Sequence, residues 1–214
     1  MLLRRTIIKI CGVTRLEDAE HLAALDADVI GLNFVASSAR CIDSETAALV
    51  AARVRPRLKV WAVFVDATRA RVEEIIGAVA PDALQFNGDE VPEYCRQFGR
   101  PYVKAFGMRS GFDIIEATRR YADAEMILLD SFSAGQRGGT GHTFDWSLWP
   151  KQSTLPMMLA GGLDPGNVAA AVHRLRPAAV DVAGGVESPI KGIKDAAHMQ
   201  AFVAQVRTAD RQVD

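Results

Sequence analysis

The sequence predicts an α/β fold, a closed (β/α)8 TIM barrel, and three observations favour it. Runs rich in Val, Ile and Leu alternate with longer amphipathic stretches, as expected of strands that are buried on both faces of a parallel sheet and covered by helices. There are eight such runs, and 214 residues divided by eight gives about 27 residues for each strand and helix, near the ~30 of a typical unit. A doubly wound open sheet is the alternative, but the chain has no Gly-x-Gly-x-x-Gly after its first strand and no Walker A sequence.

The eight predicted strands follow one another at similar spacing. They are residues 6–11, 29–34, 58–65, 83–86, 101–106, 126–130, 156–160 and 178–182. No Pro- or Ser-rich linker interrupts the series. We therefore predict a single barrel domain over residues 1–214, with a loose tail over 209–214.

The stretches between these strands have helical periodicity, most clearly at residues 16–25, where apolar side chains recur on one face. Thr14 is expected to cap this helix, and Glu17, three residues later, completes a capping box. Later helices are expected to have aspartate caps at Asp43, Asp164 and Asp195.

Composition excludes several classes of protein. The chain has 25 Lys+Arg and 26 Asp+Glu, a net charge of −1, so we expect no nucleic-acid partner. Its longest apolar runs are far shorter than the ~18 residues of a membrane helix. The chain has three cysteines, Cys11, Cys41 and Cys95, and none of them are in Cys-x-x-Cys spacing. An odd number without this spacing fits neither a disulfide framework nor a zinc cluster. With no recognisable signal peptide, we predict a cytoplasmic protein, and we expect a monomer.

Candidate catalytic residues lie at the predicted strand ends, because barrel enzymes place their chemistry at the C-terminal mouth. The first strand ends at Cys11 and the sixth at Asp130. From different sides of the ring, this thiol and carboxyl would flank a bound molecule as an acid–base pair. The alternatives are that Cys11 is a small buried apolar side chain and that Asp130 caps the following loop.

Two other features of the strands point to the same mouth. Lys9 and Asp181 interrupt apolar strands that are neighbours in a closed barrel, which predicts either a buried ion pair or a substrate contact. Pairs of glycines follow the seventh and eighth strands, at 161–162 and 184–185. Barrels of this kind commonly bind phosphate in these two loops, although each glycine pair alone is equally typical of a tight turn.

The remaining loops offer fewer candidates. Arg40, after the second strand, has the planar fork that binds carboxylate or phosphate, and the glycine-rich residues 135–142 resemble a lid. His142 is the only histidine expected in a mouth loop, so we predict no metal site. Lys104, near the end of the fifth strand, is an alternative candidate for a Schiff-base lysine. Its position inside a strand does not favour this role over a structural one.

In combination, these motifs resemble the phosphoribosylanthranilate isomerase family over residues 6–206. The motifs are Lys-Ile-Cys-Gly-Val-Thr at 9–14, Leu-Asp-Ser at 129–131, Gly-Gly-Thr-Gly at 138–141 before Phe-Asp-Trp at 144–146, Leu-Ala-Gly-Gly-Leu at 159–163, and Val-Asp-Val at 180–182 before Gly-Val-Glu at 185–187. Taken in order, they are highly specific.

The resemblance implies a cofactor-free Amadori rearrangement in tryptophan biosynthesis. N-(5-phosphoribosyl)anthranilate would become 1-(2-carboxyphenylamino)-1-deoxyribulose 5-phosphate, with Asp130 as the general acid and Cys11 as the base. Positive charge near Cys11 is expected to favour its thiolate. Arg40 would bind the anthranilate carboxylate. The other implied substrate-binding residues are Gly161, Gly162, Asp181, Gly184 and Gly185.

The sequence departs from the family pattern in three places, and two other functions stay open. Ala39 replaces a common proline, Asn87 replaces a common histidine, and Ala183-Gly184 replaces two common serines. A non-catalytic phosphosugar-binding paralogue on the same barrel is the first alternative. The second is an isomerase that acts on a related aminoaldose phosphate.

Overall fold

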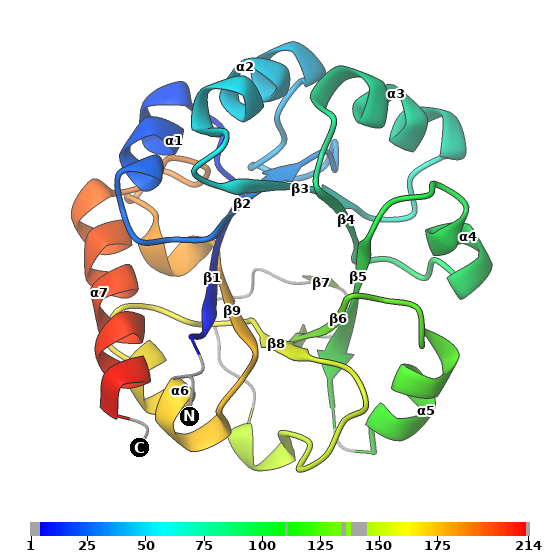
Figure 1. The fold of residues 1–214 in the computed structure, drawn as a ribbon, viewed down its shortest axis with the longest axis vertical. Helices are drawn as coiled ribbons and strands as arrows, with labels where there is room; N and C mark the ends of the chain where they lie inside the picture. Colours follow the sequence, from blue (N-terminus) through cyan, green and yellow to red (C-terminus); the bar gives the residue numbers. More distant parts are fainter. Residues whose placement is uncertain (1–4, 110, 134–135, 138–144, 213–214) are drawn as a thin grey trace.

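A computed structural model of the chain describes residues 5–109, 111–133, 136–137 and 145–212. Eight parallel strands form a closed ring with helices outside it (Figure 1), which confirms the predicted (β/α)8 barrel. The strands are β1 (Ile7–Cys11), β2 (Val29–Asn33), β3 (Lys59–Phe64), β4 (Ala83–Phe86), β5 (Tyr102–Met108), β6 (Met126–Ser133), β8 (Met157–Leu159) and β9 (Ala179–Val182). All eight coincide with the predicted runs to within a few residues.

The strand order closes the ring in the sense expected of consecutive parallel strands. β1 pairs with β2 on one side and with β9 on the other, and the β5–β6 pairing continues the ring on the far side. The short β7 (Gln136–Arg137) is antiparallel to the end of β6. β6 is longer than predicted, because pairing with β5 extends it to Ser131 and pairing with β7 extends it to Ser133. Apart from β7, the predicted lid over residues 135–142 lies outside the described residues.

The outer layer consists of helices that follow the strands. They are α1 (Leu16–Ala23), α2 (Ser44–Val54), α3 (Arg69–Val79), α4 (Pro92–Arg96), α5 (Ile114–Arg120), α6 (Val168–Leu175) and α7 (Ala196–Gln212). Two 3-10 turns, η1 (Trp146–Leu148) and η2 (Gly184–Val186), lie before β8 and after β9. None of the described helices is both long and apolar enough to cross a membrane.

The described apolar side chains form two clusters. A large cluster packs strands against helices, and it includes Ala19 and Leu22 of α1. A smaller cluster, with Val29, Trp61 and Leu128 among its members, comes from alternate strand positions, which in a barrel point inward. Burial on both faces explains why the strands read as continuous apolar runs.

The predictions for the start of α1 and for the end of the chain are wrong. Thr14 does not cap α1, because its hydroxyl donates to the carbonyl of Gly192 at 2.7 Å, and α1 begins after Arg15 with no side-chain cap. Residues 209–212 are not a loose tail, since α7 continues to Gln212 and buries Ala209.

The three predicted aspartate caps all accept backbone hydrogen bonds. Asp43 accepts from the amide of Thr46 at the start of α2, and Asp195 accepts from that of His198 at the start of α7. These two bonds satisfy donors that have no partner within the helix. Asp164 instead accepts from two amides in the turn before α6, and because the helix begins after Asn167 with no side-chain cap, the predicted Asp164 cap is wrong.

Arg207 ties the last helix to the first two strands. Its side chain, only 9% exposed, donates to the carbonyl of Thr6 at 2.6 Å, to the Asp28 carboxylate at 2.7 Å and to the Asp26 carboxylate at 3.0 Å. Asp28 also accepts from the amide of Ile8 in β1. This cluster lies at the N-terminal ends of β1 and β2, away from the mouth.

We predict that Arg207→Leu lowers the free energy of unfolding by about 3 kcal/mol, because it removes the donor to the Thr6 carbonyl and takes a nearly buried cation away from its carboxylate partners. Denaturant titration measures the loss. Arg119→Leu is the control, since Arg119 is an exposed arginine that pairs with Glu116 within α5, and it should have a much smaller effect. Equal losses in the two variants would contradict a special role for the Arg207 cluster.

Candidate active site

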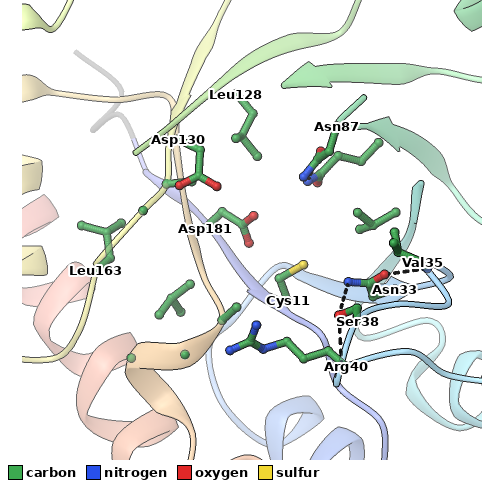
Figure 2. A pocket seen from close by; sticks show the side chains of 18 of the residues that line it. Cys11, Asn33, Val35, Ser38, Arg40, Asn87, Leu128, Asp130, Leu163 and Asp181 are labelled. Carbon is green, nitrogen blue, oxygen red and sulfur yellow. Dashed lines mark hydrogen bonds between the residues drawn. The ribbon is translucent and has the colours of Figure 1, made fainter. Parts of the chain in front are cut away.

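A cavity of about 780 Å³ opens at the C-terminal ends of the barrel strands (Figure 2). Its wall includes all eight residues proposed from the sequence: Cys11, Arg40, Asp130, Gly161, Gly162, Asp181, Gly184 and Gly185. They come from five separate parts of the chain, and only the closed barrel brings them together.

Cys11 and Asp130 project into this cavity from different strands. Cys11 is the last residue of β1, and Asp130 lies in β6 at the level of Gly107 of β5. Figure 2 shows both side chains facing the same space, with Asp181 between them. Gly31 of β2 leaves room for the thiol, because a Cβ there would lie 2.8 Å from Cys11 Sγ and 3.0 Å from Lys9 Nζ. The arrangement suits an acid–base pair acting on one bound molecule.

Lys9 and Asp181 form a buried ion pair in the barrel interior. They are directly opposite in the β1–β9 register, and Lys9 Nζ donates to both carboxylate oxygens at 2.9 Å. Asp181 also lines the cavity. The ion pair considered from the sequence is therefore present, and it lies where a ligand would contact one of its members.

The environment of Cys11 corrects one expectation from the sequence. Burial raises the pKa of the thiol above its usual value, and the opposing effect of the Lys9 charge is smaller. The nearby lysine therefore limits the rise in the thiol pKa but does not reverse it. The neutral thiol is the majority form at neutral pH.

Asp130 is tuned in the direction that a general acid needs. Burial raises the pKa of its carboxyl to about 6, against the opposing hydrogen bond from the Ser131 amide, which is 2.7 Å long. A carboxyl with this pKa holds a proton in a useful fraction of molecules near neutral pH.

The two glycine pairs line the cavity in the loops that follow β8 and β9. Gly161 and Gly162 have φ angles of +83° and +62°, which favour glycine. A Cβ on Gly161 would collide with the backbone of Ser131 and with the Asp130 carboxylate. Gly184 and Gly185 belong to the 3-10 turn η2. Backbone without side chains therefore borders the cavity at the two predicted phosphate loops.

Arg40 reaches the cavity wall, but its side chain already has a partner. Its guanidinium makes a two-point bond to Glu187, with Nε 2.6 Å from Oε1 and Nη2 2.8 Å from Oε2. The sequence motif included Glu187, but its spacing alone did not predict this contact. Lys104, the alternative considered for Schiff-base chemistry, instead donates to backbone carbonyls and to Glu90.

Several polar side chains of the cavity wall were not proposed as site residues from the sequence. Asn33, Gln85 and Asn87 are among them. Gln85 is 1% exposed and donates to Asn87 Oδ1 at 3.0 Å, and its own Oε1 has no hydrogen-bond partner among the described residues. The signal was present, because Gln85 interrupts an apolar strand just as Lys9 does.

Comparison with known proteins identifies the family. The family model described as N-(5'phosphoribosyl)anthranilate (PRA) isomerase matches residues 8–205. An N-(5'-phosphoribosyl)anthranilate isomerase of Pseudomonas putida (strain W619) is 49% identical over 201 residues, which cover 94% of this chain and 97% of that protein. The isomerase of Alcanivorax borkumensis is 45% identical, over 94% and 95% of the two chains.

Solved structures give the same result. The phosphoribosyl anthranilate isomerase of Thermus thermophilus has a TM-score of 0.85 and 30% identity, and the match covers 95% of this chain and 99% of that one. Another, in complex with reduced 1-(o-carboxyphenylamino)-1-deoxyribulose 5-phosphate, has a TM-score of 0.82, 32% identity and the same coverage. The chain therefore belongs to the N-(5'-phosphoribosyl)anthranilate isomerase family, enzymes that catalyse an isomerisation in tryptophan biosynthesis.

Proposed function

We propose that Asp130 and Cys11 divide the proton transfers of this isomerisation. Asp130 protonates the ring oxygen of the phosphoribosyl group, the bond from that oxygen to C1 breaks, and a Schiff base forms between C1 and the anthranilate nitrogen. The Cys11 thiolate then takes the proton from C2. The resulting enaminol becomes the ketone as C1 gains a proton and the C2 hydroxyl loses one. The observation that carries this assignment is that both side chains face one cavity.

The substrate is held at its two charged ends in this proposal. The glycine loops after β8 and β9 bind the phosphate through backbone amides, and Arg40 binds the anthranilate carboxylate. The solved family member in complex with a reduced carboxyphenylamino-deoxyribulose phosphate supports a ligand with these two charged ends. Both groups of residues lie at the mouth of the barrel.

Fluorescence distinguishes the enzyme from the non-catalytic paralogue. Adding this protein to N-(5-phosphoribosyl)anthranilate should remove the emission of the anthranilate-type substrate as it is converted. Saturable binding without that loss would support the paralogue. Related aminoaldose phosphates in the same assay test the broader isomerase.

The mechanism makes a first prediction about the two proposed catalytic residues. Cys11→Ser and Asp130→Asn should each lower kcat by ~10²-fold or more, because each removes one proton carrier while its shape is retained. The far-ultraviolet circular dichroism spectrum should stay unchanged, which separates lost chemistry from lost folding. A near-normal kcat in either variant would remove that residue from the mechanism.

The pH dependence of kcat/KM provides a second prediction. The reactive form has Asp130 protonated and Cys11 ionised. Between the Asp130 pKa of about 6 and the raised pKa of the thiol, each unit of pH removes protonated Asp130 and adds thiolate by about the same factor. We expect a level profile in that interval. Below pH ~6, Asp130 is already protonated and only thiolate is lost, so kcat/KM should fall about tenfold per unit.

Asp130→Asn tests the origin of the level interval. Without a titrating acid, the residual kcat/KM should follow the thiolate alone and rise about tenfold per unit of pH across the neutral range. Rates measured from about pH 5 to pH 9, with the variant in excess over the substrate, would show how kcat/KM changes with pH. A level profile in Asp130→Asn would contradict this assignment of the lower pKa.

A monomeric state and a cytoplasmic location stay predictions from the sequence. Analytical ultracentrifugation at micromolar protein concentration tests the first.

A further inference from the structure

Arg40 is fixed at a junction of three loops. It lies between β2 and α2, and its stem packs on Gly12 after β1, where a Cβ would lie 2.6 Å from Arg40 Cδ. Its Nη2 lies near Gly184 after β9, 3.3 Å from where a Cβ of that glycine would be. The side chain is 16% exposed, and it lines the cavity. The orientation of the Arg40 side chain is therefore fixed by the backbone at Gly12 and Gly184.

The Glu187 carboxylate accepts two hydrogen bonds from the Arg40 guanidinium. The two bonds of 2.6 and 2.8 Å occupy one edge of the planar group and fix its orientation as well as its position. The Glu187 side chain is 5% exposed. Although burial opposes ionisation, the hydrogen bond from Arg40 and the charge of Lys194 hold the pKa of Glu187 below its usual range. The carboxylate is therefore charged at neutral pH.

Lys194 anchors Glu187 in turn. Its buried Nζ lies 3.1 Å from Glu187 Oε1 and donates to the carbonyl of Ala183 at 2.9 Å. Arg40 and Lys194 thus share one carboxylate. Arg40 Nη1 makes no hydrogen bond to any residue that the structure describes. The second edge of the guanidinium therefore keeps donors for an anion in the cavity.

We propose that Glu187, anchored by Lys194, is a positioning residue that orients the second edge of Arg40 towards the substrate carboxylate and so makes the enzyme selective for a carboxylated aromatic amine. The proposal rests on the function and the Arg40 role proposed above. It assigns a task to two residues, Glu187 and Lys194, that the acid–base chemistry does not use.

The experiment compares two substrates that differ only in the carboxylate. They are the N-(5-phosphoribosyl) derivatives of anthranilate and of aniline, and the quantity measured is the ratio of their kcat/KM values. Because a hydrogen bond to a charged group is worth a factor of about 10 to 100, we expect that ratio for the unmodified enzyme. Arg40→Met should bring it near 1.

Glu187→Gln should lower the ratio about tenfold while kcat/KM for the aniline derivative changes little, because an unheld guanidinium no longer meets the carboxylate in a fixed orientation. Simple destabilisation would lower both rates together and leave the ratio unchanged. Glu90→Gln is the matched control, since Glu90 is also a buried carboxylate paired with a buried lysine, Lys104, at 3.3 Å. It should keep the unmodified ratio.

If Glu187→Gln does not fold, Lys194→Met replaces it. This variant keeps the Arg40–Glu187 bond and removes only the anchor, so the ratio should fall about threefold. An unchanged ratio in whichever variant folds, with the ratio lost in Arg40→Met, would overturn the positioning role alone. A ratio kept in Arg40→Met would overturn the carboxylate role of Arg40 as well. An unmodified enzyme that converts neither substrate would overturn the proposed function itself.

Discussion

The ion pair between Lys9 and Asp181 is the interaction on which the site depends most. It joins the first and last strands of the ring inside the barrel, where an unpaired charge would be strongly unfavourable. The same two residues set the electrostatics of the mouth, because Lys9 opposes the effect of burial on Cys11 and Asp181 adds to the raised pKa of Asp130. Closure of the barrel and tuning of the acid–base pair thus share one contact.

Much of the fold was predictable because a parallel barrel imposes a simple pattern. Strands buried on both faces require apolar runs, and their spacing reflects one helix and two loops. The site was predictable for the same reason, since residues such as Cys11, Asp130 and Asp181 interrupt or end those runs. A polar group in an apolar strand is unfavourable unless it has a partner or a task. Gln85 carried the same signal and was overlooked.

What the sequence did not predict depends on contacts between distant segments. Thr14 has a side chain that commonly caps helices. Its hydroxyl instead donates to a carbonyl in the loop before α7, 178 positions away in the chain. The raised pKa of Cys11 depends on burial by the whole barrel. The Arg40–Glu187 bond joins residues 147 positions apart. Such effects follow from the closed ring and cannot be read from local spacing.

The central claim is that one thiol and one carboxyl act on opposite flanks of the same sugar. A crystal structure with reduced 1-(o-carboxyphenylamino)-1-deoxyribulose 5-phosphate would test it most directly. We expect Cys11 Sγ within about 4 Å of C2 and an Asp130 oxygen about 3 Å from the hydroxyl derived from the ring oxygen. A ligand bound with either side chain directed away from these atoms would contradict the mechanism.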